Sequence, residues 1–294
     1  MQDLKGKTAF ITGGASGIGL AMAKAFGHEG MQIMLADIEA APLAAAVEEL
    51  RALQVRVEGV LCDVSSRASQ QAAALETIAK FGKIHLVCNN AGVGGGGNVG
   101  EVPQGDWDWV VAVNLMGVVN GVEVFTPLIE SHGEGGHFVN TASMAGMISP
   151  AGMEPYSATK FAVVAMSEGW AAQLAPRGIG VSILCPGFVK TRIHESRRNR
   201  PANFAADTRP AQFDDTLANP VLTGIPVGPV AGRVVEAVKA DELYIMTHPE
   251  FKPILAARFD AILAAFDRAA ASPALSVLPP RETPGADIGQ VADI

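Results

Sequence analysis

Short apolar runs alternate along the chain with longer stretches in which apolar residues recur every three or four positions. The short runs predict buried strands, and the longer pattern predicts amphipathic helices. The predicted strands are TAFIT (8–12), MQIMLAD (31–37), VRVEGVLCD (55–63), IHLVCNN (84–90), GHFVNTAS (136–143), VSILCP (181–186) and LYIM (243–246). The predicted helices cover residues 20–30, 41–53, 66–81, 103–114, 116–131, 155–175, 230–240 and 251–270.

Buried strands separated by helices of this length are typical of βαβ units with right-handed crossovers. We therefore expect an α/β fold: a doubly wound, Rossmann-type parallel β-sheet with helices on both faces. No linker or change in composition interrupts the series. The sequence thus predicts a single domain over residues 1–271.

Residues 188–228 break this rhythm just after the sixth predicted strand. They are rich in proline, arginine and asparagine and show no clear period. Because loops of this length in compact domains are usually functional or disordered, we interpret the segment as a substrate lid within the same domain. Residues 272–294 are rich in proline and predict an irregular C-terminal tail.

Composition narrows the class of protein. Of the 294 residues, 49% are apolar, and the net charge of −8 argues against nucleic acid or an anionic membrane as a partner. No apolar run approaches the roughly 18 residues of a membrane span, and the start MQDLKGKTAF lacks the pattern of a signal peptide. Cys62, Cys88 and Cys185 lie far apart in apolar runs, as reduced core thiols do. We expect a cytoplasmic globular protein.

A glycine-rich turn, TGGASGIG (12–19), lies between the first predicted strand and the first helix. Glycines there permit a tight turn and let backbone N–H groups approach a pyrophosphate at the positive end of the helix. Asp37 ends the second strand, 18 residues after Gly19. A carboxylate at that point accepts hydrogen bonds from the ribose 2′-hydroxyl of NAD and repels the 2′-phosphate of NADP. The pattern therefore predicts NAD, unless Asp37 merely ends a strand.

The stretch PYSATK (155–160) places Tyr156 and Lys160 four residues apart on one face of a predicted helix. Such a pair is by default a surface pair. Pro155 suits the first turn of that helix. A free phenol, with a pKa near 10, is a poor base at neutral pH, whereas a neighbouring ammonium and a cationic nicotinamide favour the phenolate. The pair therefore indicates a titratable tyrosine in alcohol oxidation.

Over about residues 5–190 the sequence resembles the short-chain dehydrogenase/reductase family in its compact single-domain branch. The motifs occur in the family's order: TGGASGIG, CDV with Asp63, NNAG (89–92), VNLMG with Asn114, NTASMAG with Ser143, PYSATK and PGFVKT (186–191). The resemblance implies the catalytic residues Asn114, Ser143, Tyr156 and Lys160. The residues it implies for cofactor binding are Gly13, Ser16, Gly17, Ile18, Gly19, Asp37, Asp63, Val64, Asn90, Ala91, Gly92, Tyr156, Lys160, Pro186, Gly187, Val189 and Thr191.

The resemblance also implies a role for each catalytic residue. Lys160 would bind the nicotinamide ribose, Ser143 would hydrogen-bond the substrate oxygen, and Asn114 would hold a water linking Lys160 to solvent. The alternatives are a strand-ending serine at Ser143 and a capping or turn asparagine at Asn114. Dimers or tetramers of identical subunits are expected on the same basis.

Other stretches bear on the substrate. GVGGGGN (92–98) is either a flexible loop or space for a bulky substrate. The methionines near the catalytic residues favour an adaptable apolar wall; they are Met144, Met147 and Met153. The lid arginines are either solvated or meet an anionic substrate group or a partner subunit; they are Arg197, Arg198 and Arg200. His132 and His137 have no evident third ligand, so we predict no metal.

Within the family, residues 120–130, 132–146, 186–201 and 243–251 are most similar to bacterial Cα-dehydrogenases of lignin-derived aryl ethers, which oxidise a benzylic alcohol with NAD. This implies a bulky apolar or aromatic alcohol, with a hydroxysteroid or another apolar alcohol as the alternative. The C-terminus departs from the compact branch, because LYIMTHPE runs into a helix. Two readings from other classes remain: a nucleotide-sugar isomerase or dehydratase, whose glycine turn is spaced differently, and a non-catalytic NAD-sensing protein.

Overall fold

The computed structural model describes residues 1–202, 204 and 219–277. The chain divides into two compact units, Met1–Thr247 and a second unit that begins at His248. The sequence grouped residues 251–270 with the Rossmann domain, whereas the structure assigns helix α9 (Lys252–Ala270) to the second unit. Most of the central part of the predicted lid and most of the predicted tail lie outside the described residues.

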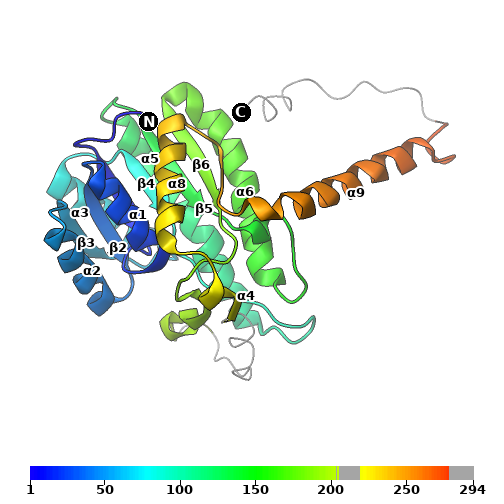
Figure 1. Cartoon of the computed structure of the whole chain (residues 1–294), viewed down its shortest axis with the longest axis horizontal. Helices are drawn as coiled ribbons and strands as arrows, with labels where there is room; N and C mark the ends of the chain where they lie inside the picture. Colours follow the sequence, from blue (N-terminus) through cyan, green and yellow to red (C-terminus); the bar gives the residue numbers. More distant parts are fainter. Residues whose placement is uncertain (203, 205–218, 278–294) are drawn as a thin grey trace. The chain divides into compact units, whose positions relative to one another are not determined.

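The first unit is built on one sheet of seven parallel strands in the order β3-β2-β1-β4-β5-β6-β7 (Figure 1). The strands are β1 (Thr8–Thr12), β2 (Gln32–Asp37), β3 (Val57–Leu61), β4 (Leu86–Asn89), β5 (Gly136–Thr141), β6 (Ile179–Cys185) and β7 (Tyr244–Met246). Each lies within three residues of its predicted range at either end. The predicted doubly wound, parallel architecture is confirmed.

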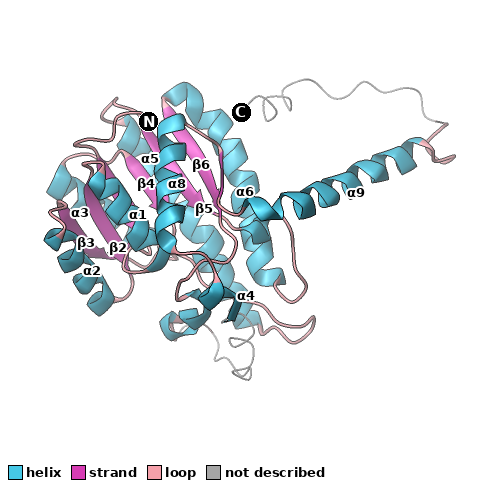
Figure 2. Cartoon of the chain, viewed as in Figure 1, coloured by secondary structure: helices cyan, strands magenta, loops and turns pink. Residues whose placement is uncertain are grey.

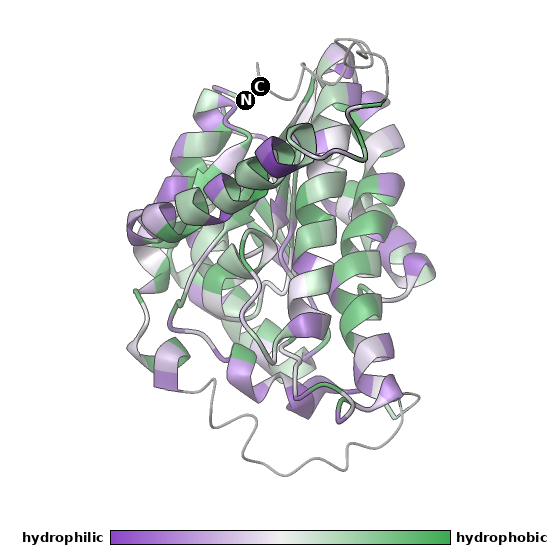
Figure 3. Ribbon diagram, turned by 90° about the vertical axis from the view of Figure 1, so that its right-hand side faces the viewer, coloured by the Kyte–Doolittle hydropathy of each residue, from purple (hydrophilic) through white to green (hydrophobic). Residues whose placement is uncertain are grey.

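Helices cover both faces of this sheet (Figures 1 and 2). Helix α1 packs against α2 and α8, while α3 packs against α5 and α4 packs against α6. The α-helices of this unit are α1 (Gly17–His28), α2 (Ala40–Ala52), α3 (Arg67–Phe81), α4 (Gln104–Val110), α5 (Gly117–Glu130), α6 (Glu154–Leu174) and α8 (Val227–Ala240). Their ribbons carry both hydrophobic and hydrophilic turns in Figure 3, as the amphipathic pattern predicted.

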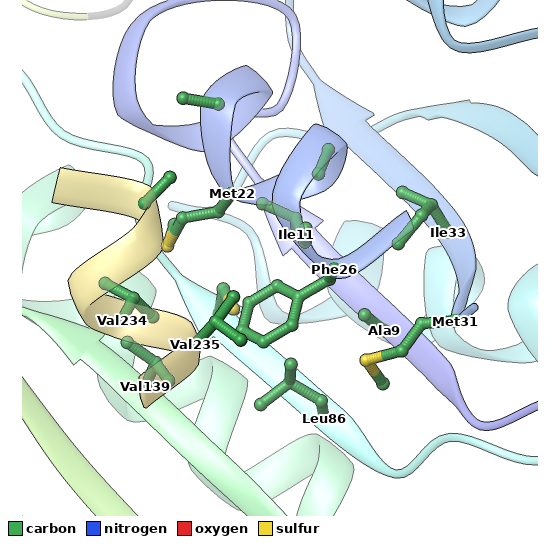
Figure 4. Packing of buried hydrophobic residues seen from close by; sticks show 14 of the residues in the cluster. Ala9, Ile11, Met22, Phe26, Met31, Ile33, Leu86, Val139, Val234 and Val235 are labelled. Carbon is green, nitrogen blue, oxygen red and sulfur yellow. The ribbon is translucent and has the colours of Figure 1, made fainter. Parts of the chain in front are cut away.

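The core on the α1 face shows why these elements form. Met22 and Phe26 of α1 are fully buried between the strands and the valines Val234 and Val235 of α8 (Figure 4). Burying a side chain of this size contributes about 1.5–3 kcal/mol. The apolar stripe of α1 is therefore held against the sheet, and the start of α1 is fixed beside the end of β1.

Strand order reverses direction between β1 and β4, which are direct neighbours through the pairs Ala9–Leu86, Phe10–Val87 and Ile11–Cys88. The chain runs outward from β1 through β2 to β3, and then returns to β4 on the other side of β1. In open α/β sheets a crevice forms at such a switch point, beyond the carboxyl ends of the strands. The fold therefore predicts a ligand site at the ends of β1 and β4.

Residues 104–130 form a continuous helical stretch instead of the two predicted helices. A π-helical segment, Val111–Met116, joins α4 to α5. The stretch is long and apolar enough to cross a membrane, but 61% of its apolar window is buried inside the fold, as in a core helix. Asn114 lies in the π-helical segment and is fully buried.

The second unit contains a short 3-10 turn, Pro249–Phe251, and helix α9. No residue of α9 is buried. Its exposed large apolar side chains include Phe259, Leu263 and Phe266.

Candidate active site

The glycine turn between β1 and α1 has the geometry that close approach of a phosphate requires. Gly13 and Gly17 have positive φ angles of 62° and 55°, which side chains disfavour. A Cβ at Gly19 would lie 2.2 Å from the carbonyl oxygen of Gly13. Helix α1 begins at Gly17 after its N-cap Ser16, and the first N–H groups of a helix have no partner within it. The turn can therefore hold an anion.

Thr12 joins this turn to the segment after β4. Its hydroxyl accepts hydrogen bonds from the N–H groups of Asn90 (2.9 Å) and Ala91 (3.0 Å). The Asn90 side-chain amide donates to the Thr12 carbonyl at 2.9 Å. Thr12 belongs to the predicted glycine motif but was not among the predicted binding residues. Its position as the last residue of β1 could have indicated this role.

A cleft of about 120 Å³ lies at the carboxyl ends of β1, β2 and β4. Its lining includes predicted binding residues from separate segments of the chain: Gly13, Ser16, Asp37, Asp63, Val64, Ala91 and Gly92. Two backbone N–H groups hold the carboxylate of Asp37: Ala15 donates to Oδ2 at 3.0 Å and Glu39 to Oδ1 at 3.1 Å. The cleft therefore holds a fixed carboxylate where an adenosine ribose would lie.

Ser143 and Tyr156 meet at the same edge of the sheet. Ser143 follows β5 and caps a 3-10 turn, where its Oγ accepts a hydrogen bond from the N–H of Ala145 at 3.0 Å. Tyr156 lies in the first turn of α6, next to Pro155. Ser143 lies close enough to Tyr156 to lower the pKa of its phenol. The predicted convergence of a strand end and a helix start is present.

Lys160 lies one helical turn after Tyr156 and is only 3% exposed. Its Nζ donates to the carbonyl oxygen of Thr141 at 2.8 Å and lies 5.5 Å from the centre of the Tyr156 ring. Burial lowers the pKa of the Lys160 ammonium from its ordinary 10.5 to about 8, and Cys185 opposes this shift. The amine therefore stays mostly protonated at pH 7 but loses its proton more readily than a solvated lysine.

Without a cofactor, the pKa of Tyr156 is raised. Burial raises it above its ordinary value of 10, and Ser143 lowers it only in part. The reason is that a desolvated phenol resists ionisation. The sequence predicted that Lys160 and a cationic nicotinamide together lower the pKa of Tyr156. That lowering therefore requires both positive charges.

The side chain of Asn114 is committed to the backbone of Val93. Its Oδ1 accepts from the Val93 N–H at 2.8 Å, and its Nδ2 donates to the Val93 carbonyl at 2.9 Å. The amide therefore fixes the segment next to Gly92, where a Cβ would lie 3.6 Å from the Nζ of Lys160. The predicted water-holding role of Asn114 stays a prediction.

The PGFVKT segment lies beside both the catalytic serine and the glycine turn. The Pro186 carbonyl accepts from the N–H of Met144 at 2.8 Å and from the Ser143 hydroxyl at 3.4 Å. A Cβ on Gly17 would lie 3.2 Å from the Thr191 methyl carbon. Val189 is buried in the core, and Ile18 packs against that core. These two residues can therefore offer a ligand their backbone groups but not their side chains.

The lid arginines pair with acidic side chains of the first unit. Arg198 donates from Nε and Nη2 to the two carboxylate oxygens of Glu39, at 3.1 and 2.8 Å. Arg197 and Arg200 pair with Asp106, whose side chain is only 3% exposed. The sequence showed no arginine next to Asp37, but the fold brings Arg198 to the same cleft.

One group of described residues could hold a metal ion: His85, His132 and Glu134, whose ligand atoms lie within 4.8 Å of one another. The nitrogens of both imidazoles already have partners. His85 Nδ1 accepts from the Thr8 N–H, and its Nε2 lies 2.9 Å from the Glu134 carboxylate. His132 accepts from the Glu134 N–H and bonds the carbonyl oxygen of Ile84. The sequence had instead paired His132 with His137, which is buried in β5 against Ser182.

The residues present fit a dinucleotide cofactor. The glycine turn leaves space that a Cβ would fill, α1 directs its first N–H groups there, and Asp37 offers a fixed carboxylate at the far end of the cleft. At the other end lie a hydroxyl, a phenol and a buried amine from Ser143, Tyr156 and Lys160. This set can bind a substrate oxygen and exchange a proton with it.

Comparison with known proteins agrees with this geometry. The sequence profile of the short chain dehydrogenase family matches residues 7–202. A C alpha-dehydrogenase of Sphingobium sp. (strain NBRC 103272 / SYK-6) is 36% identical over 90% of this chain and 87% of that protein. A CLA biosynthesis dehydrogenase/reductase of Lactiplantibacillus plantarum is 33% identical over 90% of this chain and 95% of its own length.

A solved structure is similar along most of the chain. The short chain dehydrogenase/reductase from Burkholderia phymatum, in complex with NAD, has a TM-score of 0.88 and 40% identity, covering 90% of this chain and 97% of that one. The family's profile, the relatives along nearly the whole chain and the site geometry all agree. The chain belongs to the short-chain dehydrogenase/reductase family and is an oxidoreductase acting on a CH–OH group.

Proposed function

We propose that the protein is an NAD-dependent dehydrogenase that interconverts a secondary alcohol and a ketone, with Tyr156 as the general base or acid. The observation that carries the proposal is the convergence of Ser143, which follows β5, with Tyr156 and the buried amine of Lys160 in the first turns of α6, at the carboxyl ends of the strands. A buried amine is costly unless a partner or a ligand stabilises it.

Each side chain has a part in moving one proton. Ser143 donates a hydrogen bond to the substrate oxygen and holds it next to the Tyr156 phenol. Tyr156, as phenolate, accepts the hydroxyl proton during oxidation; as phenol, it returns a proton during reduction. Lys160 directs its remaining N–H groups toward the nicotinamide ribose, and its positive charge favours the phenolate. When bound, NAD supplies the acceptor for the hydride that leaves the substrate carbon.

The cofactor is NAD, which the related Burkholderia phymatum structure holds. Asp37 supports this choice, because its carboxylate is fixed by two backbone N–H groups and would repel a 2′-phosphate. Arg198 brings a positive charge to the same cleft, but Glu39 pairs with it at both carboxylate oxygens. The net charge of this corner therefore stays negative.

For the substrate we propose a bulky apolar or aromatic alcohol, in particular a benzylic one. The similarity to a C alpha-dehydrogenase along 90% of the chain supports this. The buried methionines Met144 and Met147 beside Ser143 add apolar surface near the reacting atoms. We further propose that the protein acts in the cytoplasm as a homo-oligomer.

The direct test is absorbance at the nicotinamide band. Purified protein is mixed with NAD or NADP and with benzylic, steroid and aliphatic secondary alcohols, each in parallel. We expect reduction of NAD with the benzylic alcohols. Reduction of NADP alone would contradict the interpretation of Asp37, and activity confined to steroid or aliphatic alcohols would contradict the benzylic substrate.

A non-catalytic NAD-sensing protein is the alternative from another class. NADH binding measured by fluorescence separates the two functions, because a sensor binds NADH without turning over any alcohol or ketone. The Ser143–Tyr156–Lys160 arrangement favours the enzyme.

A further inference from the structure

Residues 192–201, which we call the strap, follow the PGFVKT segment and reach the cleft at Arg198. The strap contains the 3-10 segment Ile193–Asn199. Its Ser196 is 6% exposed and accepts a hydrogen bond from the Gly94 N–H at 2.9 Å. Three strap residues, Arg198, Asn199 and Pro201, line the same cleft as Asp37 and Asp63. The strap is therefore a wall of the proposed adenosine pocket.

Among the described residues, Asp106 is a buried anchor of the strap. Arg200 and Arg197 both pair with Asp106 of α4. The Arg200 guanidinium also lies 5.6 Å from the centre of the Trp109 ring, and Trp109 lines the cleft. Because Asp106 and Arg200 are both buried, separating them would leave charges without water, which is strongly unfavourable. We expect this end of the strap to stay in place.

The other attachment of the strap is only partly buried. Arg198 and Glu39 form two parallel hydrogen bonds, with 26% and 21% of their side chains exposed. Arg198 is the main cause of the lowered pKa of Glu39, and Asn199 lowers it further. Glu39 is the N-cap residue of α2 and follows Asp37 by two positions. This pair therefore ties the strap to the end of β2, at a contact that water can reach.

The cleft under this pair is small. Its volume of about 120 Å³ is below the roughly 300–1,000 Å³ of ligand pockets. An adenosine in this cleft would lie against Arg198 and Asn199. The Arg198–Glu39 pair is more exposed to water than the Arg200–Asp106 pair, so it is the easier of these two contacts to open.

We propose that the Arg198–Glu39 pair is a latch that sets how fast the adenosine end of the cofactor enters and leaves. Opening the latch moves Arg198 and Asn199 away from Glu39, while the Asp106 anchor holds the rest of the strap. Arg198 and Glu39 are thus positioning residues that act on the cofactor pocket. This inference rests on the proposed NAD binding.

The test compares Arg198→Gln, Glu39→Gln and the double variant with the unchanged protein. Stopped-flow fluorescence measures NADH binding, and its release when excess NAD displaces it. We expect both rate constants to rise about fivefold in each single variant. The double variant should be no faster than the single ones, because the same pair is lost. Raising the salt concentration should speed release from the unchanged protein but not from the variants.

A matched control lies at the other end of the same helix. Arg51 of α2 pairs with Glu48 and Glu58 on the exposed surface, so Arg51→Gln removes a similar pair far along α2 from the cleft. Its NADH rate constants should equal those of the unchanged protein. Arg198→Gln removes the ion pair without changing Glu39, the N-cap residue of α2. An effect seen in this variant therefore comes from loss of the pair and not from a damaged helix cap.

Hydrogen exchange of the protein alone gives a readout that needs no cofactor. The amides of residues 193–200 should exchange faster in Arg198→Gln, while those of α2 and α4 stay unchanged. The latch is overturned if exchange in the strap does not change, or if NADH release speeds up while binding slows, since that pattern signals a damaged pocket. If the unchanged protein shows no NADH binding, the proposed function fails as well; equal NADH rates in all variants would reject the latch alone.

Discussion

Two groups of side chains lie at opposite ends of the strands. His85, His132 and Glu134 lie close together at the amino ends. The second group, at the carboxyl ends, consists of Ser143, Tyr156 and Lys160. Both groups contain buried titratable side chains. At the amino ends, His85 is hydrogen-bonded to the backbone through one nitrogen and His132 through both. Glu134 is half exposed and forms an ion pair with Lys83. At the carboxyl ends, the Lys160 ammonium has three N–H donors and donates one hydrogen bond to the Thr141 carbonyl oxygen.

The pKa values show what this difference means. At the amino end, hydrogen bonds from Lys83 and then His85 lower the pKa of Glu134 to about 2, so its charge is stabilised. At the carboxyl end, burial lowers the pKa of Lys160 and raises that of Tyr156, so both charged forms are disfavoured. Groups whose charged forms lack stabilisation are the ones a bound ligand can stabilise. We therefore expect the carboxyl end to be the reactive one.

Tyr156→Phe should have the largest effect. Removing the phenol oxygen removes the proton acceptor, and we expect kcat to fall about 10²–10⁴-fold. NADH affinity should change little, because the ring remains in place. Steady-state kinetics and NADH titration check the two parts. Retention of more than a tenth of the activity would contradict the role of Tyr156.

Lys160→Met should lower activity about 100-fold and yet stabilise the fold at neutral pH. The folded pKa of Lys160 is about 8 and its ordinary value is 10.5, so between these values the unfolded chain binds more protons than the folded one. Stability of the unchanged protein therefore rises with pH across this window. Below pH 8 the buried ammonium lowers the free energy of unfolding by about 3 kcal/mol. The hydrogen bond to the Thr141 carbonyl offsets part of this loss.

Urea unfolding at several pH values tests this stability prediction. The variant should be more stable than the unchanged protein at pH 7, and the difference should shrink as the pH rises from 8 toward 10. A variant that is less stable at pH 7 would show that the Lys160 ammonium is well stabilised by its surroundings. The charged groups at the two ends of the strands would then not differ in their stabilisation.

Asp37→Ala should shift the choice of cofactor at the adenosine side of the cleft. Losing a charged acceptor of the ribose hydroxyls should reduce kcat/KM with NAD about 10–100-fold, while NADP becomes usable. Asp37→Asn is the matched variant, since it keeps an acceptor oxygen and removes only the charge. If the ratio of NAD to NADP efficiency is the same in all three proteins, Asp37 does not select the cofactor.

His85→Ala should have the smallest effect on activity. The Thr8 N–H loses its buried acceptor, so we expect the free energy of unfolding to fall by about 1–3 kcal/mol, with kcat/KM within about twofold of the unchanged value. EDTA should alter neither the activity nor the melting temperature. A zinc-dependent rise in melting temperature that His85→Ala abolishes would show that the amino end is a metal site.

Much of the fold could be predicted because its strands are buried on both faces. Such strands appear as continuous apolar runs, and TAFIT matches β1 at both ends. The π-helical segment could not be predicted, because it continues the helical pattern of its neighbours and is fixed by the Asn114–Val93 contacts. The 3-10 segment Ile193–Asn199 is similar, since it depends on partners elsewhere in the fold.

Some contacts of the candidate site could likewise be predicted from the sequence, and others could not. Tyr156 and Lys160 are four residues apart, so a helical period alone brings them together. Arg198 and Glu39 are 159 residues apart, and the sequence shows both charges without showing that they meet. The raised pKa of Tyr156 in the protein without cofactor has a related reason: burial is a property of the folded chain, and it outweighs the lowering by Ser143.

The most direct test of the central claim follows a single hydrogen atom. Unchanged protein is incubated with NAD and 1-phenylethanol that carries deuterium on the carbinol carbon, and the reduced cofactor is analysed by mass spectrometry. The account predicts NADH that carries one deuterium, with acetophenone formed in equal amount and no product in Tyr156→Phe. Reduced cofactor without deuterium, or no reduction of NAD by any secondary alcohol in the panel, would contradict it.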